Sequence, residues 1–268
     1  MPKVDNDPTK TAAKPFLIVA GVRCGGTFLA HGLSNHSQVF CDRGETMHQH
    51  CIWRKKASMS HLELLRILTH QEGYLASGFR MVYSQALSKY IWRHIVATKP
   101  KIIHLIRANV LRQAVSFCFH QKVRKGRAEY YPVHAFRQQP PPAPVVISPA
   151  TILHFCRQSM NANAAVTARL GKADLQVLDL EYAAMVGGEG LSRPCVTKGI
   201  AATICDFLGV RQTSLCSDLK RVHQHPLRAM LANWEEVRAA VTASPWAKWL
   251  EHEAQWQQDD KGRWQIKR

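Results

Sequence analysis

Residues 16–35 read FLIVAGVRCGGTFLAHGLSN, and this stretch decides the fold. Its first five residues form an apolar, partly β-branched run that is typical of a strand buried on both faces. Gly21, Gly25 and Gly26 then allow the backbone to turn tightly and to come close to a ligand. Thr27 opens a helical pattern, so the sequence predicts a strand, a tight turn and the amino end of a helix.

The amino end of such a helix attracts anions, because its first N–H groups lack intrahelical partners and its dipole is positive there. The spacing from Gly21 to Gly26 matches the G-x-x-x-x-G of phosphate-binding loops, but Thr27 stands where those loops carry lysine. Arg23 supplies a cation inside the turn, and its planar guanidinium can hold two oxygens at once. The turn is therefore predicted to bind a phosphate-bearing ligand. The alternative is a glycine turn that only connects a strand to a helix.

A second segment, KIIHLIRANVLRQAVSF at residues 101–117, has a similar organisation. Its apolar run predicts a central strand, and Arg107 follows that strand at the edge where open α/β sheets bind ligands. Asn109 is predicted to cap a helix over residues 110–123, on which Ser116 lies about two turns from the start. Arg107 and Ser116 are expected to hold one phosphate. The alternative is a surface ion pair for Arg107 and an ordinary helix position for Ser116.

The stretch GVRCGGTFLAHGLSNHSQVFCDRGE at residues 21–45 resembles the donor-binding loop and following strand of sulfotransferases that use 3′-phosphoadenosine 5′-phosphosulfate (PAPS). The resemblance is to the bacterial and carbohydrate-type branch in particular. Residues 101–117 resemble the 3′-phosphate-binding strand and helix of the same family, and weaker resemblances occur at 78–85, 178–182 and 204–210. The family implies a single α/β domain, with a mainly parallel central sheet flanked by helices in a P-loop-like arrangement. It also implies PAPS as sulfuryl donor, 3′-phosphoadenosine 5′-phosphate (PAP) as product, and no metal.

The resemblance also implies which residues bind the nucleotide. They belong to the glycine turn and to the second segment: Arg23, Cys24, Gly25, Gly26, Thr27, Phe28, Arg107 and Ser116. Arg107 and Ser116 are nine positions apart here, whereas the cytosolic members usually have eight, so Arg112 is a second candidate for the phosphate contact. Cys24 is expected to have no covalent role.

Sulfuryl transfer requires electrostatic stabilisation of the leaving oxygen and a base for the acceptor proton. Arg23 is predicted to stabilise the leaving oxygen through charge and hydrogen bonds alone, because a guanidinium does not give up its proton. Glu45, where carbohydrate-type members carry an acidic residue, is the first candidate for the base. His48 is the second, because histidine titrates near neutral pH. The alternative for Glu45 is an ion pair with Arg43.

The composition indicates one sizeable core, since 46% of the 268 residues are hydrophobic. We expect a flexible tail over residues 1–14 and a single sulfotransferase domain over residues 15–268. No apolar run is long enough to cross a bilayer, and the amino terminus has no apolar signal core, so a cytoplasmic protein is expected. The eight cysteines form no C-x-x-C pair, which favours reduced thiols. No H-E-x-x-H or similar metal-binding spacing occurs.

The net charge of +17 has two possible explanations. A basic surface can bind nucleic acid or an anionic membrane, or it can steer an anionic nucleotide and an acidic acceptor toward a cleft. The Lys and Arg residues are spread along the chain and are not interleaved with aromatic residues, which favours the second explanation. We therefore expect a small-molecule or carbohydrate acceptor and no nucleic-acid or membrane partner; the oligomeric state is not predicted. The alternative functions are a P-loop kinase that uses ATP and a non-catalytic basic binding protein.

Residues 124–149 interrupt the alternation of strands and helices. They contain RKGRAEYY and QQPPPAPVV, and the prolines of the second run exclude a regular helix. A long loop within a compact domain is often a lid or a binding loop. The segment is predicted to cover the acceptor site, with a solvated surface insertion as the alternative.

Overall fold

The structure is a computed structural model that describes residues 13–43, 61–125, 143–187, 194–219, 225–258 and 264–266. Within these residues, five parallel strands form one sheet in the order β2-β3-β1-β4-β5. The strands are β1 (Lys14–Ala20), β2 (Val39–Asp42), β3 (Ala76–Val82), β4 (Lys101–Ile106) and β5 (Val177–Glu181). This confirms the predicted α/β fold with a parallel central sheet. The glycine turn follows β1 and the turn that carries Arg107 follows β4, and these two strands are neighbours.

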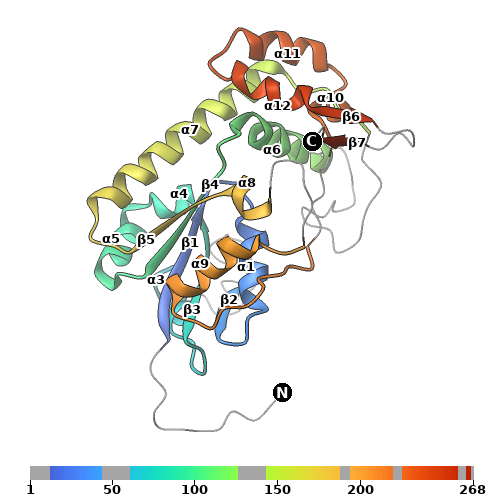
Figure 1. The fold of residues 1–268 in the computed structure, drawn as a ribbon. Coiled ribbons are helices and arrows are strands. Elements are labelled where there is room, and N and C mark those ends of the chain that lie inside the picture. Colours follow the sequence, from blue (N-terminus) through green and yellow to red (C-terminus); the bar gives the residue numbers. More distant parts are fainter. Residues whose placement is uncertain are drawn as a thin grey trace.

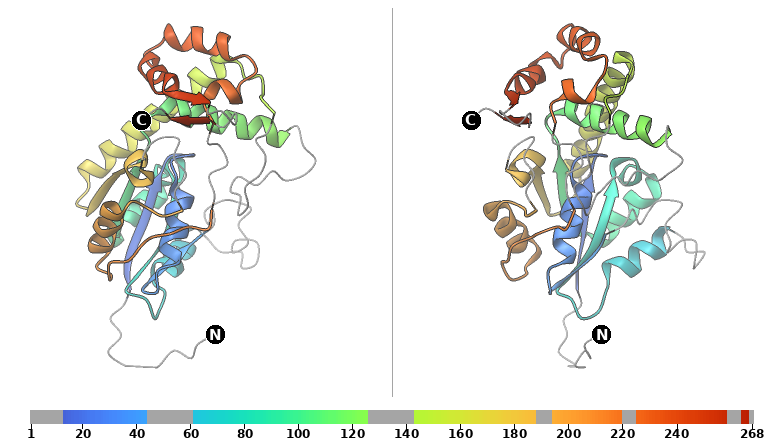
Figure 2. Two further views of the ribbon diagram at one scale, coloured as in Figure 1. Left: turned by 45° about the vertical axis from the view of Figure 1, so that its right-hand side comes forward. Right: turned by 90° about the vertical axis from the view of Figure 1, so that its right-hand side faces the viewer.

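Helices cover both faces of the sheet (Figure 1), and the two further views in Figure 2 show the sheet between them. One face packs against α1 (Gly26–Ser34), α8 (Tyr182–Val186) and α9 (Lys198–Leu208). The other packs against α3 (His61–Thr69), α4 (Tyr83–Ala86), α5 (Lys89–Thr98) and the second half of α7 (Pro149–Lys172). The alternating side chains of β1 supply both cores, because successive residues of a strand point to opposite faces.

A third hydrophobic core lies beyond the carboxyl ends of the strands, where α6 and the first half of α7 meet the C-terminal helices (Figure 1). These elements are α6 (Val110–Lys125), α10 (Leu227–Met230), α11 (Trp234–Thr242), the 3₁₀ turn η1 (Ala247–Trp249) and α12 (Leu250–Ala254). A short antiparallel pair, β6 (Trp256–Gln258) and β7 (Trp264–Ile266), follows them. The C-terminal helices therefore lie at the edge of the sheet where the sequence places its anion-binding turns.

The segment after β3 is not one continuous helix. It is divided into α4 and α5 at Ser88, whose backbone is extended (φ −60°, ψ 129°). Arg169 of α7 donates a hydrogen bond of 2.7 Å to the carbonyl of Leu87. The packing of α7 thus stabilises this interruption, which the local sequence does not indicate.

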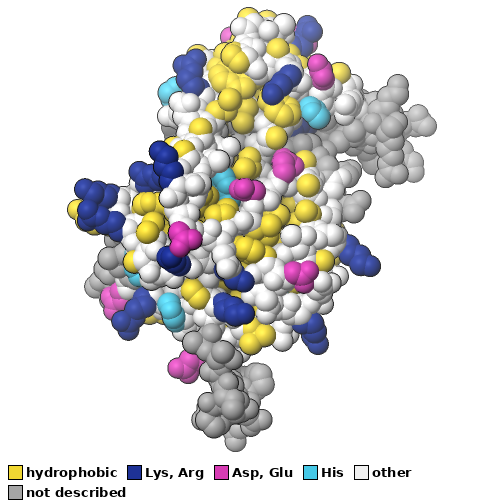
Figure 3. All heavy atoms as spheres, turned by 60° about the vertical axis from the view of Figure 1, so that its left-hand side comes forward, with side chains coloured by type: hydrophobic (Ala, Val, Ile, Leu, Met, Phe, Trp, Pro, Cys, Tyr) yellow, Lys and Arg dark blue, Asp and Glu magenta, His cyan; other side chains and the backbone are white. Residues whose placement is uncertain are grey.

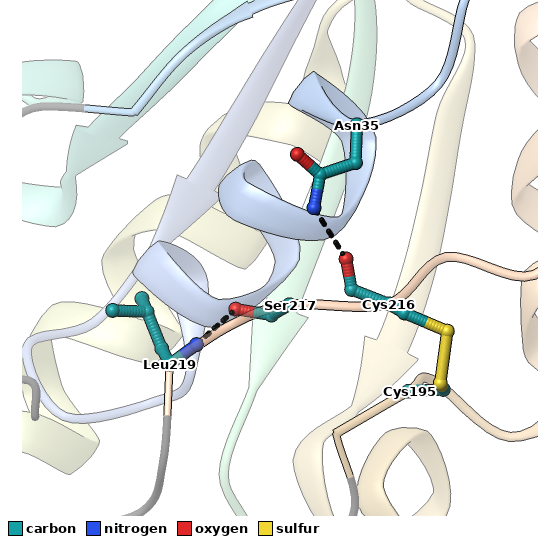
Figure 4. Close-up of a disulfide and its surroundings, with 5 residues drawn as sticks. All are labelled: Asn35, Cys195, Cys216, Ser217 and Leu219. Atoms are coloured by element: carbon teal, nitrogen blue, oxygen red, sulfur yellow. Dashed lines mark hydrogen bonds between the residues drawn. A yellow bond between two sulfur atoms is a disulfide. The ribbon is translucent and has the colours of Figure 1, made fainter. Parts of the chain in front are cut away.

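The expectation that the cysteines are reduced thiols is wrong for one pair. Cys195 and Cys216 form a disulfide (Figure 4), and their two segments pair as an isolated antiparallel bridge. The bridge holds the segment before α9 against the one after it, and the carbonyl of Cys216 also accepts a 2.9 Å hydrogen bond from Asn35 at the end of α1. Spacing could not reveal this pair, because only the fold brings the two segments together. The other described cysteines are buried thiols: Cys24, Cys41, Cys118, Cys156 and Cys205.

Candidate functional site

The turn after β1 presents the amino end of α1. Gly25 precedes the helix with a left-handed backbone (φ 83°), and the first intrahelical hydrogen bond runs from Leu29 N–H to the Gly25 carbonyl at 3.0 Å. The amides of Gly26, Thr27 and Phe28 therefore precede that bond. These are the groups that bind an anion at a helix amino end.

Two glycines in this turn lie so close to other side chains that a Cβ atom has no room there. A Cβ at Gly25 would lie 2.7 Å from the ring of Tyr182, and one at Gly26 would lie 2.7 Å from Cδ of Arg80. Arg23 also has a left-handed backbone (φ 63°), which is uncommon for a residue other than glycine. Both glycines are therefore required by close packing against β3 and the segment after β5.

The turn after β4 positions a buried arginine. The Arg107 side chain is only 6% exposed, and its guanidinium carbon lies 4.6 Å from the centroid of the Tyr182 ring. Arg107 Nη1 donates a hydrogen bond of 3.1 Å to the carbonyl of Arg23. Tyr182 therefore contacts both turns, since its ring lies against Gly25 and under Arg107.

Helix α6 joins the two turns through side chains. The predicted cap is confirmed, because Asn109 Oδ1 accepts a 3.0 Å hydrogen bond from Arg112 N–H. Six positions after Val110, Ser116 accepts a hydrogen bond of 3.0 Å from Nε of Arg23. Arg107 and Ser116 thus both contact Arg23, one at its backbone and one at its side chain.

Arg112, the second candidate for the phosphate contact, has a buried carboxylate partner. Its guanidinium donates to both carboxylate oxygens of Glu253 in α12, at 2.6 and 3.1 Å. Glu253 also accepts a 2.8 Å hydrogen bond from the Leu227 amide at the start of α10. Both charged side chains are about 95% buried. This pair fastens the C-terminal helices to α6.

Sequence reasoning missed the contribution of β5. Glu181 accepts hydrogen bonds from the amides of Ala108 (3.2 Å) and Ala184 (3.0 Å), so one carboxylate ties the turn after β4 to the start of α8. Tyr182 follows it and packs against both of the turns that are predicted to bind anions. The signal was present in LDLEY at residues 178–182, where an acidic residue and an aromatic residue follow an apolar strand.

A buried polar chain borders the same region. His104 of β4 is fully buried, and it lies 2.7 Å from Asp179 Oδ1 through Nδ1 and 3.1 Å from the Tyr83 hydroxyl through Nε2. The Tyr83 hydroxyl is also 3.1 Å from Asn163 Oδ1 on α7. Burial raises the pKa of Tyr83 above its usual value, so the phenol is neutral. This chain links α4, β4, β5 and α7.

The remaining predicted residues have different positions. Cys24 is buried and its Sγ lies 3.8 Å from the Val22 carbonyl, while Phe28 is partly buried and packs against the core beneath α1. Glu45 and His48 lie outside the described residues. Most of the proline-rich segment does as well, but Val145 near its end pairs with Leu231.

A crystal structure of a sulfotransferase from Alicyclobacillus acidocaldarius matches this chain with a TM-score of 0.51 and 18% identity, over 90% of this chain and 95% of the other. The chain shares the fold of a sulfotransferase. A sulfotransferase domain from the curacin biosynthetic pathway matches with a TM-score of 0.47 and 14% identity, over 90% and 96% of the two chains. Neither a protein-family model nor a curated protein matches the sequence. At these identities, the likeness concerns the sulfotransferase fold alone.

Among the described residues, no group of three or more His, Cys, Asp or Glu side chains is arranged to hold a metal ion. Within the same ranges, each helix is too short or too polar to cross a bilayer.

Proposed function

We propose that the protein is a PAPS-dependent sulfotransferase, which transfers a sulfuryl group to a hydroxyl or amine of a small-molecule or carbohydrate acceptor. One observation carries the proposal: the two predicted anion-binding segments meet at Arg23, whose Nε donates a hydrogen bond to Ser116 of α6, 93 positions away in the sequence, and whose carbonyl accepts one from Arg107. PAPS has phosphate groups at both ends of its ribose, so it requires two adjacent anion sites. The match in fold to a sulfotransferase supports the same function.

The residues of the first turn fit the phosphosulfate end. The amides of Gly26, Thr27 and Phe28 precede the first intrahelical hydrogen bond of α1, and the positive end of the helix dipole adds to their attraction for an anion. Arg23 provides the full positive charge. Its guanidinium is oriented by Ser116, so its position does not depend on the ligand.

In the proposed reaction the bond between sulfur and the 5′-phosphate oxygen breaks, and its electron pair stays on that oxygen. A new bond forms between sulfur and the acceptor oxygen or nitrogen, whose proton passes to the base. Arg23 stabilises the charge that develops on the departing phosphate. Arg107 and Ser116 hold the 3′-phosphate, and Glu45 is the proposed base, with His48 as the alternative.

The first experiment is calorimetric titration of the protein with PAP, ATP with Mg²⁺, and a random oligonucleotide. We expect PAP to bind without a metal and at least tenfold more tightly than ATP, because Thr27 stands where a kinase carries lysine. Tighter binding of ATP with Mg²⁺ would support the kinase. Salt-sensitive binding of the oligonucleotide in the absence of PAP binding would support a nucleic-acid-binding protein.

A second experiment tests the reaction and the base. Candidate acceptors are incubated with PAPS and analysed by mass spectrometry for an added sulfuryl group. Once an acceptor is found, Glu45→Ala should lower kcat strongly and leave PAP affinity unchanged, whereas His48→Ala should have a small effect. The reverse result would assign the base to His48.

The acceptor lid remains part of the proposal. Val145 should be kept in any deletion, because its amide and carbonyl bond to Met230 and Ala232 at 3.0 Å each. Removal of residues 128–142 should therefore leave PAP affinity intact and abolish turnover of the acceptor. Unchanged acceptor kinetics would instead identify the segment as a surface insertion.

A further inference from the structure

A cavity of 230 Å³ lies between the start of α6, the middle of α7 and residues 245–249. Its wall includes Cys24 from the first turn and Arg107 from the second, together with Trp246 and Trp249 from the C-terminal helices. A ligand in this cavity would therefore lie beside both predicted anion sites. The proposed sulfotransferase chemistry does not assign any group to it.

The two tryptophans provide fixed aromatic surfaces. Trp246 is 6% exposed, and its indole N–H donates to Met160 Sδ at 3.0 Å. Trp249 is half-buried and stacks on His252 with ring centroids 5.5 Å apart. Because Met160 and His252 hold these two rings in place, a planar ligand can contact the rings without the entropic cost of ordering them.

The charged groups of the wall are positive. Arg107 and Lys248 both line the cavity, and Lys248 Nζ lies 5.1 Å from the centroid of Trp249. Among the described residues that line it, none is Asp or Glu. The nearby Glu181 accepts hydrogen bonds from two backbone amides, one of them that of the lining residue Ala108. The wall thus favours an anion.

The polar groups of the wall add no negative charge. Tyr83 is a neutral phenol because burial raises its pKa, and its hydroxyl lies 3.1 Å from Asn163 Oδ1. Because this oxygen accepts from Tyr83, Asn163 can offer its NH₂ group to a ligand as a hydrogen-bond donor. Hydrogen-bond donors and cations therefore accompany the aromatic surfaces.

We propose that this cavity binds a planar aromatic ring that carries an anionic group. A cavity of about 150 Å³ can hold benzene, so one of this size has room for one or two fused rings. Figure 3 shows hydrophobic side chains on the upper part of one face, at the height of α11 and α12, with Lys and Arg as well as acidic and His side chains around them. Such a ring has two possible sources: the base of the donor nucleotide, or a separate aromatic acid.

The test measures binding by calorimetry with three probes of related size: 2-naphthoate, 2-naphthol and decahydro-2-naphthoate, the saturated and therefore non-planar form of the first. We expect 2-naphthoate to bind at least tenfold more tightly than the other two, because it alone has both the ring and the charge. Trp249→Leu should lower the affinity for 2-naphthoate about tenfold. Lys248→Met should lower that affinity several-fold without changing the affinity for 2-naphthol. Trp92→Leu and Lys89→Met on α5 are the matched controls, because neither residue lines the cavity.

Competition with PAP identifies the source of the ring. If PAP displaces 2-naphthoate and Trp249→Leu also weakens PAP, the ring is the base of the nucleotide. If both bind together, the ring belongs to a separate acid. Equal binding of 2-naphthoate and decahydro-2-naphthoate, or affinities that are unchanged in both Trp249→Leu and Lys248→Met, would overturn the proposal. Lys248 is exposed, so its variant remains informative even where Trp249→Leu does not fold. Failure of PAP to bind would contradict the proposed sulfotransferase function, but it would not contradict the proposal that this cavity binds an anionic aromatic ring.

Discussion

The two turns that are predicted to bind anions follow neighbouring parallel strands, but they are built differently. The turn after β1 offers backbone amides, and its shape depends on Gly25 and Gly26, which pack against other side chains. The turn after β4 offers the side chain of Arg107, which is held by Tyr182 and the Arg23 carbonyl. A site made from backbone tolerates few substitutions at its glycines. A site made from side chains depends on the elements that orient them.

The largest expected effect concerns the ion pair between Arg112 and Glu253, which holds α12 against α6, the helix that follows the second turn. Glu253→Gln should lower the free energy of unfolding by about 3 kcal/mol, because it leaves the buried Arg112 guanidinium without its carboxylate. Denaturant unfolding measures the change. Glu251→Gln, an exposed substitution on the same helix, should have little effect. A decrease in the free energy of unfolding below about 1 kcal/mol, the range of a surface ion pair, would show that this pair contributes little to holding α12 in place.

The next effect concerns the backbone of the first turn. Gly25→Ala should cost about 2 kcal/mol of stability and weaken PAP at least tenfold, because the left-handed backbone and the contact with Tyr182 both oppose a Cβ. Gly73→Ala is the matched control: it has φ +82° and no atom within 4 Å of its Cβ position, so it tests the backbone penalty alone. Equal losses of stability in the two variants would show that the contact with Tyr182 adds nothing to the backbone penalty.

A smaller effect separates charge from geometry at the second turn. Arg107→Lys keeps the charge but loses the planar group that lies over Tyr182, and it should weaken PAP about tenfold, or about 1.4 kcal/mol. Arg93→Lys, on the exposed side of α5, is the control. Wild-type affinity in Arg107→Lys would mean that charge alone is needed there.

The smallest effect concerns the contact between the turns. Ser116→Ala removes the acceptor for Arg23 Nε and should reduce PAP affinity about fivefold, in keeping with about 1 kcal/mol for one hydrogen bond. Ser84→Ala at an exposed position is the control. Ser116 is also proposed to hold the 3′-phosphate; if that contact contributes more than the hydrogen bond to Arg23, the loss should approach that of Arg107→Lys.

The sequence predicted the first turn well because its information is local. An apolar strand, glycines at fixed positions and a helix start are visible in twenty residues, and β1 and α1 have the expected order and nearly the expected bounds. The strand β4 and the Asn109 cap were predictable for the same reason. The roles of Arg23, Arg107 and Ser116 in binding stay predictions.

The partners of those residues were not predictable, because they are distant in sequence. Tyr182 reaches both turns from the end of β5, Glu253 reaches Arg112 across 141 positions, and Cys195 meets Cys216 only after α9 has folded back. Helix propensity likewise did not indicate the interruption at Ser88, which the side chain of Arg169 stabilises. In each case tertiary packing decides the outcome.

The position of β1 in the middle of the sheet has a consequence for biosynthesis. Among the five described strands of this sheet it is the first to be translated, yet its two partners, β3 and β4, are translated much later. Until residue 106 has emerged, a nascent chain therefore exposes an apolar segment with unsatisfied edges, a form that favours aggregation and recruits chaperones. Truncated chains that end before β4 should accumulate with chaperones, whereas chains that extend past it can complete the centre of the sheet.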